Sequence, residues 1–367
     1  MIVDHICVNF GASLFQEFFD ALDALKLEQN VFYPRNKGHR IVDLETPYRI
    51  YSPEILNLLT KVSFSKKRHV MLQEYDPLFH NNKPDIIHAH TLFSDGSLAH
   101  YYSKSYGTPY IVAVRSTDIA YFLKYKPWLK SYGKKILDRA SFIVFISPSL
   151  KKRFNQIFGN NYESKSTIIP NGINQFYLNQ DDSHKKTLHT PPELLYVGSF
   201  LKRKNVPALI SLLENSEARL TIAGEGGRNE KKVLKLIQDN DRISYVGHVE
   251  DKSRLVQIYK QSDIFIMASR GETFGLVYLE AMSQGLPVIY SKNTGIDGLF
   301  EQGTIGYGVS PGSVSEMAKA IEQIKSAFKN ISGNCIKEAR NFNWSSIAEK
   351  YQSLYSRVIS SSVPGQL

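Results

Sequence analysis

The strongest restriction on the fold of this sequence comes from a regular alternation in its second half. Short apolar runs of strand length begin at Leu194, Leu220, Ile243, Ile264 and Pro287. The segments between these runs place apolar residues at positions i, i+3 and i+4, which is the spacing of amphipathic helices. Strands that alternate with helices in this way form βαβ units, so we expect a mostly parallel sheet covered by helices.

The first half of the chain repeats this scheme less regularly. Strand-like runs begin at His5, Asp85, Tyr110 and Phe142. The 367 residues are enough for two domains, each with a core of its own. We therefore expect an α/β protein with two Rossmann-like domains that face each other across a cleft.

The expected domain limits follow from local composition. Polar residues typical of a linker fill 179–192, which would separate an N-terminal domain (1–178) from a C-terminal domain (193–345). The last segment, 346–367, has apolar residues at helical spacing. We expect it to form a closing helix that packs back toward the N-terminal domain.

The composition excludes several classes of protein. Two cysteines near opposite ends of the chain cannot form a disulfide framework or a Cys-rich metal site. No apolar stretch approaches the roughly 20 residues of a membrane span, and the N-terminus does not have the pattern of a signal peptide. A net charge of +10 indicates an anionic partner, which could be nucleic acid, phosphate or an acidic membrane surface.

Two glutamates on either side of an expected helix start are the sharpest candidates for a binding site. Glu272 follows a strand-like run, and Glu280 lies within the next helix. At about 1.5 Å per residue, their carboxylates would lie on the order of 10 Å apart, which suits a ligand with a sugar at each end of a diphosphate. The amides of Phe274, Gly275 and Leu276 would bind phosphate or hydroxyl oxygens. Alternatively, Glu272 only stabilises the helix start and Glu280 is a surface residue.

A basic loop after the run at Leu194 is the second candidate. It carries Lys202, Arg203 and Lys204, whose cations could stabilise negative charge on a diphosphate leaving group. The alternative is a basic loop that is merely solvated.

Taken together, these segments resemble glycosyltransferase family 4, which comprises retaining enzymes of the GT-B fold. The match runs in order through most of 85–358, and it is most specific in the stretch GETFGLVYLEAMSQGLPVI from Gly271. The stretches PDIIHAH from Pro84 and PNGI from Pro170 are moderately specific. The resemblance implies that Glu272 holds hydroxyls of a donor sugar and that Glu280 holds the ribose.

The resemblance also implies roles around the rest of a nucleotide sugar. The further residues expected to bind the donor are Ser199, Arg203, Lys204, His248, Val249, Phe274, Gly275, Leu276 and Gly11. Lys204 would bind the pyrophosphate, and it is the expected catalytic residue together with Glu272, which would position the sugar. Ser199 stands where the family usually has an arginine, whose charge Arg203 or Lys202 could supply.

In the N-terminal domain, the resemblance assigns contacts with the acceptor or the sugar to His90, Arg115 and Asp118. Arg115 stands where the family usually has a histidine, and a guanidinium can donate hydrogen bonds but cannot act as a base. His88 and His90 form an H-x-H pair, but no third ligand is evident in the sequence, so we expect no metal.

These inferences predict a retaining hexosyltransferase. It would move a hexosyl group from a UDP- or GDP-linked sugar to a hydroxyl of a saccharide or lipid-linked saccharide, in surface polysaccharide or glycoconjugate synthesis, without a cofactor. One alternative is a non-catalytic GT-B partner subunit of a glycosyltransferase complex, which Ser199 and Arg115 favour. A phosphorylase or epimerase of the same fold is another, and a basic nucleic-acid binder is a third, although no recognised binding module accompanies the charge.

The segment 122–142 mixes basic and aromatic residues. Such segments dock on anionic lipid headgroups, with Trp and Tyr at the interface, but a solvated helix face would look the same. We expect a cytoplasmic protein that contacts the inner face of a membrane peripherally through this segment and binds no nucleic acid.

Overall fold

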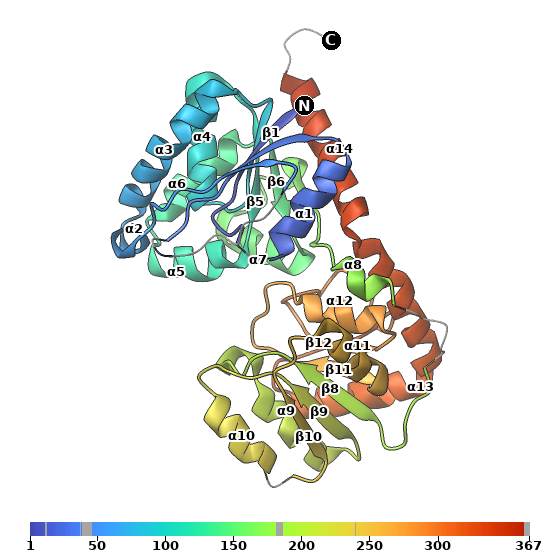
Figure 1. The fold of residues 1–367 in the computed structure, drawn as a ribbon. Helices are drawn as coiled ribbons and strands as arrows, with labels where there is room; N and C mark the ends of the chain where they lie inside the picture. Colours follow the sequence, from blue (N-terminus) through green and yellow to red (C-terminus); the bar gives the residue numbers. More distant parts are fainter. Residues whose placement is uncertain (12, 37, 39–45, 181–185, 239, 363–367) are drawn as a thin grey trace. The chain divides into compact units, whose positions relative to one another are not determined.

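A computed structural model describes the chain except for residues 12, 37, 39–45, 181–185, 239 and 363–367. The chain divides into two compact α/β units (Figure 1). Unit 1 comprises Met1–Ile146, Leu150–Gly172 and Trp344–Leu367. Unit 2 comprises Ser147–Ser149 and Ile173–Asn343.

A parallel sheet of seven strands forms the centre of unit 1, in the order β3-β2-β1-β4-β5-β6-β7. The strands are β1 (Ile2–Ile6), β2 (Glu28–Phe32), β3 (Arg49–Tyr51), β4 (Ile86–Ala89), β5 (Tyr110–Val114), β6 (Phe142–Phe145) and β7 (Ser166–Ile168). The order reverses between β1 and β4, so the carboxyl ends of these two strands flank the switch point at which open α/β sheets bind ligands.

Helices connect and cover the strands of this sheet. They are α1 (Ser13–Ala24), α2 (Leu58–Val62), α3 (Phe64–Asn81), α4 (Ser94–Tyr106), η1 (Asp118–Phe122), α5 (Leu123–Tyr125), α6 (Leu129–Arg139), α7 (Pro148–Phe158), η2 (Glu163–Lys165) and α14 (Trp344–Ser362).

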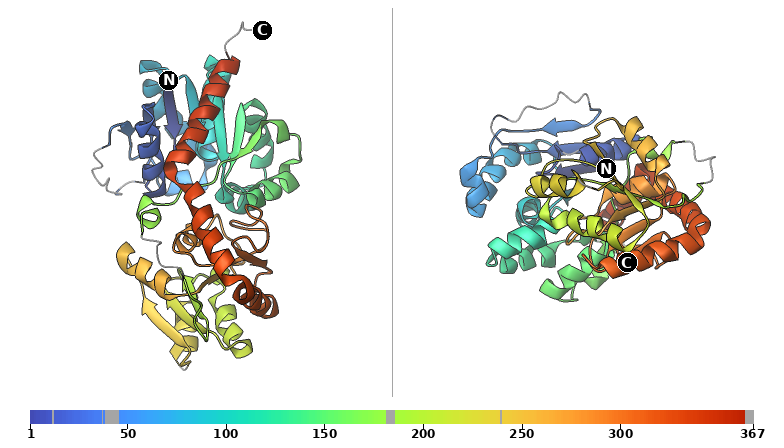
Figure 2. Two further views of the ribbon diagram at one scale, coloured as in Figure 1. Left: turned by 90° about the vertical axis from the view of Figure 1, so that its right-hand side faces the viewer. Right: turned by 90° about the horizontal axis from the view of Figure 1, so that it is seen from below.

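The core of unit 1 joins the two ends of the chain. The helix α14 lies beside α1 (Figures 1 and 2). Phe18 and Phe19 of α1 are buried in one cluster with Tyr351 and Tyr355 of α14. The apolar spacing of the last segment therefore serves to cover the first domain, although that segment follows the second domain in the sequence.

Unit 2 has a parallel sheet of six strands in the order β10-β9-β8-β11-β12-β13. The strands are β8 (Glu193–Val197), β9 (Arg219–Ala223), β10 (Ile243–Gly247), β11 (Ile264–Met267), β12 (Val288–Ser291) and β13 (Gly306–Val309). The helical segments are α8 (Gln175–Leu178), η3 (Lys202–Lys204), α9 (Val206–Leu212), η4 (Leu213–Asn215), α10 (Glu230–Gln238), α11 (Lys252–Gln261), α12 (Leu276–Ser283), α13 (Val314–Ala339) and η5 (Arg340–Phe342). The switch point of this sheet lies between β8 and β11.

The prediction of two α/β domains with parallel sheets and a C-terminal helix is confirmed. The boundary between the units differs from the expected one, because the chain enters unit 2 at Ile173. Within the expected linker (179–192), the described residues are tied to unit 2. Lys186 Nζ donates to the carbonyl of Tyr259 at 3.0 Å, and the His189 amide donates to Asp263 Oδ2 at 3.2 Å. Residues 181–185 of that segment lie outside the described residues.

Among the helices of the described residues, none is both long enough and apolar enough to cross a membrane.

Candidate functional site

The loops that follow β8 and β11 meet at the switch point of unit 2. The β8 loop contains the basic turn η3, and the β11 loop leads to the start of α12. The two loops are joined through their backbones, since the Arg270 amide donates to the Arg203 carbonyl at 2.7 Å. Arg203 Nη1 also donates to the Gly271 carbonyl at 3.0 Å. The basic loop and the glutamate loop are therefore one structural unit.

An ion pair lies at the centre of this junction. Lys204 Nζ donates to Glu272 Oε2 at 2.6 Å, and only 11% and 8% of the two side chains are exposed. Arg203 Nη1 lies 3.4 Å from the same oxygen, but its side chain is 48% exposed. The structure thus brings together the two expected catalytic residues, which are far apart in the sequence. Charges withdrawn from water interact more strongly than exposed ones.

The backbone of Glu272 is held by Thr294, in the loop after β12. The Glu272 amide donates to Thr294 Oγ1 at 2.7 Å, and that hydroxyl donates back to the Glu272 carbonyl at 2.7 Å. The Thr273 amide donates to Glu272 Oε1 at 3.0 Å, which fixes the direction of the carboxylate. Sequence reasoning missed Thr294. Its position just after a strand-like run was the signal that could have identified it.

The start of α12 requires a glycine. Gly275, the N-cap residue, has φ 87° and ψ 68°, a left-handed conformation that favours glycine. A Cβ at this position would lie 2.6 Å from the ring of Tyr278 and 3.2 Å from Glu272 Cγ. The Tyr278 amide donates to the Gly275 carbonyl at 3.0 Å. The first amides of a helix, here those of Leu276 and Val277, have no carbonyl within the helix to bind, so they can donate to oxygen atoms of a ligand. The side chain of Phe274 is buried, which leaves its backbone as the part that a ligand could reach.

The turn after β8 packs so closely against the turn after β9 that only a glycine fits between them. Gly224 after β9 has φ 141°, and a Cβ there would lie 2.1 Å from the carbonyl oxygen of Gly198. The Tyr196 hydroxyl donates to the Ser199 carbonyl at 2.9 Å, which holds the residue that stands in place of the family's arginine. Burial, together with the charge of Glu272, raises the pKa of Tyr196, so this phenol remains a donor.

Glu280 has a partner that the sequence did not reveal. The hydroxyl of Tyr259, in α11, donates to Glu280 Oε2 at 3.0 Å. Burial raises the pKa of Tyr259, so the hydroxyl keeps its proton and fixes one carboxylate oxygen. His248 and Val249 lie on the loop after the edge strand β10, where His248 is exposed and Val249 is half-buried. That loop lies at the same edge of the sheet as the β8 loop.

In unit 1, the carboxylate of Asp118 binds backbone amides. Its side chain is fully buried and accepts hydrogen bonds from the amides of Arg115, Leu92 and Phe93 at 2.8, 3.1 and 3.4 Å. Burial raises its pKa to about 6. Asp118 therefore joins the segment after β5 to the start of α4, and its contact with the acceptor or the sugar stays a prediction.

Arg115 is half-buried, and its guanidinium makes two hydrogen bonds and one contact with an aromatic ring. Its Nε donates to the His90 carbonyl at 3.2 Å, its Nη1 donates to Asn171 Oδ1 at 3.3 Å, and its guanidinium lies 5.6 Å from the ring centroid of Phe15. A hollow of about 10 Å³ adjoins these residues, which is room for about one water molecule. Gly11, after β1, is exposed.

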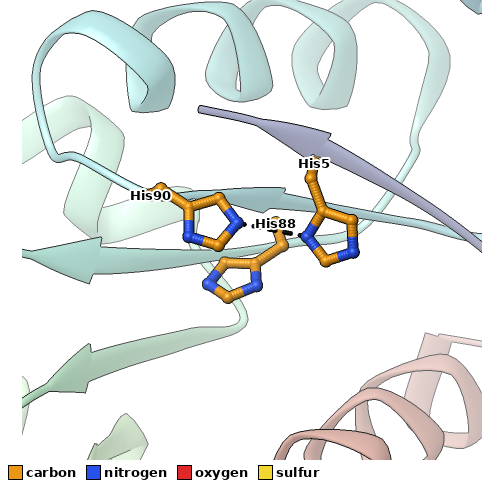
Figure 3. Close-up of side chains that lie close together, drawn as sticks. All are labelled: His5, His88 and His90. Atoms are coloured by element: carbon orange, nitrogen blue, oxygen red, sulfur yellow. Dashed lines mark hydrogen bonds between the residues drawn. The ribbon is translucent and has the colours of Figure 1, made fainter. Parts of the chain in front are cut away.

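The side chain of His90 is buried among other rings (Figure 3), and its contact with the acceptor or the sugar stays a prediction. His5 of β1 and His88 of β4 lie beside it, and one ring nitrogen from each of the three histidines lies within 4.8 Å of the others. His5 Nδ1 is 3.1 Å from His90 Nε2, and His88 Nδ1 is 2.8 Å from the Tyr355 hydroxyl. Burial lowers the pKa of all three histidines, that of His5 to about 3, so the cluster is neutral.

His5 is the third histidine that the sequence did not reveal, and neutral imidazoles can bind metals. The register of the sheet sets His5 opposite His88. However, the rings of His88 and His90 stack with centroids 3.9 Å apart and planes at 28°. One nitrogen of each ring also has a protein partner, since His90 Nε2 lies 3.1 Å from His5 Nδ1 and His88 Nδ1 lies 2.8 Å from the Tyr355 hydroxyl. The histidines are part of the packed core as the structure describes it, and the absence of a metal stays a prediction.

Two family models match the chain. The model described as glycosyl transferases group 1 matches residues 179–342, and the model described as glycosyltransferase family 4 matches residues 14–175. The two matches together include the loops of the Lys204–Glu272 site, and they include His88 of β4 and His90, which follows that strand.

The chain is also similar to individual proteins of known sequence or structure. An uncharacterized glycosyltransferase of Methanocaldococcus jannaschii is 26% identical over 304 residues, which are 75% of this chain and 75% of that protein. The structure of sucrose-phosphate synthase from Thermosynechococcus elongatus matches with a TM-score of 0.76 at 20% identity, over 98% of this chain and 100% of that chain. The structure of Anabaena HepE in complex with UDP matches with a TM-score of 0.72 at 17% identity, over 97% and 99%. At these identities, the structural matches show a shared fold.

Proposed function

Because this chain belongs to glycosyltransferase family 4 and has the GT-B fold, we propose that it transfers a hexosyl group from a UDP- or GDP-linked sugar to a hydroxyl of a saccharide or lipid-linked saccharide. The observation that carries the proposal is the Lys204–Glu272 pair beside the start of α12. A cation, a carboxylate and free helix amides at one switch point match the charges and hydroxyls of a nucleotide sugar.

Each group of the site has a role in donor binding. Hydroxyls of the sugar would donate to Glu272, whose carboxylate is already oriented by the Thr273 amide. The Lys204 ammonium has three donors, so it can bind a diphosphate oxygen while it still contacts Glu272. The ribose hydroxyls would donate to Glu280, which Tyr259 orients.

The chemical step that we propose retains the anomeric configuration. The bond from the anomeric carbon to the diphosphate oxygen breaks, and the acceptor oxygen attacks the same face of an oxocarbenium-like sugar. The acceptor proton passes to the departing diphosphate. Negative charge on the diphosphate is stabilised by Lys204, by Arg203 and by the amides at the start of α12. The role of Glu272 is then to position the sugar.

The test measures donor binding first and transfer second. We expect UDP or GDP and a corresponding sugar nucleotide to raise the melting temperature of the full chain, because a ligand that binds only the folded state stabilises it. K204M and E272Q should lower transfer about a hundredfold or more. K231M, which removes an exposed lysine of α10, is the matched control. Nucleotide binding without any transfer by the unmutated chain would favour the non-catalytic partner subunit instead.

We also propose that the segment 122–142 contacts an anionic membrane. Tyr125 and Trp128 are 59% and 68% exposed, and Leu59 of α2 is 58% exposed. Lys126 Nζ donates to the Val62 carbonyl at 2.8 Å, so α2 and this segment form one surface of exposed apolar and basic groups. Co-sedimentation with vesicles that contain anionic lipid, but not with neutral vesicles, is the expected result. Equal binding by W128S and the unmutated chain would contradict it.

A further inference from the structure

A cavity of about 260 Å³ in unit 1 has no role in the site described above. Its lining comes from segments that follow three strands of the sheet. Asn36 follows β2, Leu56 follows β3, and Tyr121 and Phe122 lie in η1 after β5. The carboxyl ends of parallel strands lie at the same edge, and that edge is where such sheets bind ligands.

Three lysines line this cavity: Lys61, Lys67 and Lys126. Among the described residues, none of them has a carboxylate oxygen within the 4.0 Å of an ion pair. Lys67 is the least accessible, and burial lowers its pKa, while the charge of Asp95 opposes that shift. The carboxylates of Asp95 and Asp118 act on the Lys67 ammonium only through space, at more than ion-pair distance. Lys61, Lys67 and Lys126 therefore give the wall of the cavity a positive charge, which favours an anion.

The position of the Lys67 ammonium is defined by a hydrogen bond. Lys67 Nζ donates to Ser94 Oγ at 2.8 Å, and Ser94 is the first residue of α4. An ammonium has three donors, so Lys67 can also donate to a ligand oxygen. Lys126 Nζ donates to the carbonyls of Lys61 and Val62 at 3.3 and 2.8 Å. Two of the three cations are therefore held in place before a ligand arrives.

Aromatic rings complete the lining. Phe64, Tyr121 and Phe122 contribute to the wall, and Lys126 Nζ lies 6.0 Å from the ring centroid of Phe122. Phe122 is in turn stacked on the buried ring of Phe93, at 5.3 Å between centroids. Flat apolar faces beside cations suit a small ring-shaped molecule that carries a negative group.

We propose that this cavity binds the phosphate or carboxylate group of an anionic saccharide acceptor. Lys67 is the central contact, with Lys61 and Lys126 beside it, and Phe122 packs against the sugar ring. A neutral saccharide would offer no negative charge to the three lysines of the wall. The proposal rests on the proposed function, because only a transferase needs an acceptor. It narrows the acceptor to sugars that carry a phosphate or a carboxylate.

Calorimetric titration of the full chain at fixed ionic strength tests this proposal. The probes are glucose 6-phosphate, galactose 1-phosphate, glucuronate, glucose and inorganic phosphate. We expect at least one of the three anionic sugars to bind more tightly than both glucose and inorganic phosphate. If inorganic phosphate binds as tightly as every anionic sugar, the cavity is a site for free anions and the acceptor proposal is wrong. If none of the probes binds, the proposal is wrong as well.

Two matched variants locate the binding. K67M keeps an apolar stem but removes the ammonium, and K66M removes an exposed ammonium from the adjacent position of α3. Loss of a charge-assisted hydrogen bond should weaken binding of the anionic sugar about tenfold or more in K67M, with little change in K66M. Equal weakening in both variants would overturn the assignment. If K67M does not fold, K61M provides the same test, since Lys61 is exposed.

A donor titration separates this inference from the proposed function. UDP and GDP should stabilise K67M as they stabilise the unmutated chain, because Lys67 belongs to unit 1 and the donor residues belong to unit 2. Nucleotide binding without anionic sugar binding would refute the inference alone. Binding of an anionic sugar that depends on Lys67, without any nucleotide binding, would refute the proposed function and leave a sugar-anion site.

Discussion

The ion pair between Lys204 and Glu272 provides the most direct test of how the candidate site is built. Lys204 Nζ and Glu272 Oε2 are 2.6 Å apart, and about nine-tenths of each side chain is inaccessible to solvent. Removal of either partner in K204M or E272Q leaves the other group buried without its main counter-charge. We expect each single variant to lose about 2–3 kcal/mol of unfolding free energy.

The free energy of coupling is more informative than either loss. In the double variant, neither group is left unpaired, so its loss should be smaller than the sum of the single losses by about 1.5–3 kcal/mol. Arg203 is the matched control. It contacts the same oxygen at 3.4 Å, but about half of its side chain is exposed, so its coupling to Glu272 should be at most about 1 kcal/mol.

Urea denaturation of the unmutated chain and of both sets of variants measures these quantities, with the transition of unit 2 followed separately from that of unit 1. A coupling below about 0.5 kcal/mol for Lys204 and Glu272 would mean that the pair does not exist in solution. Equal coupling for Arg203 and Lys204 would refute the reasoning from burial.

Further predictions concern the glycine, the buried imidazoles and the tyrosine partner of the site. G275A should lose about 2 kcal/mol or more of unfolding free energy, because its Cβ would lie 2.6 Å from the Tyr278 ring at a positive φ, and urea denaturation measures this. The lowered pKa of His5, about 3, means that the unfolded chain takes up a proton below pH 6.5 while the folded chain does not. The unfolding free energy should therefore fall by up to about 1.4 kcal/mol per pH unit between pH 6.5 and 3 on account of this group, and H5Q should show a shallower fall than the unmutated chain. Y259F removes the hydroxyl that orients Glu280, so calorimetry should show UDP or GDP binding that is weaker by about threefold to tenfold. An unchanged affinity would mean that Tyr259 has no part in donor binding.

The alternation of strand-like and helix-like segments was sufficient to predict both sheets and the amphipathic C-terminal helix. Each signal is local, since side-chain periodicity along a strand or helix reflects which face is buried. For the same reason, local composition did not place the point at which the chain enters unit 2, which is Ile173. The polar stretch after 178 looks like a linker, but its Lys186 and His189 are bound to unit 2. Polar composition does not reveal that such a segment has partners elsewhere in the chain.

The sequence identified Glu272, Lys204 and Gly275 as candidates because they stand in specific local patterns, and the structure places them together. It could not reveal Thr294 and Tyr259, which orient the two glutamates, since these contacts join loops and helices that are distant in the sequence.

The sequence could not show which of the other candidate residues are buried. His90 and Asp118 have the residue types of a ligand site, yet both are buried, one in a cluster with His5 and the other against backbone amides. The order of residues thus dictated the strands, the helices and the chemical groups available at the strand ends. The pairing of strands and the packing of side chains then settled which of those groups remain accessible, because burial and long-range contacts arise only when distant segments fold against each other.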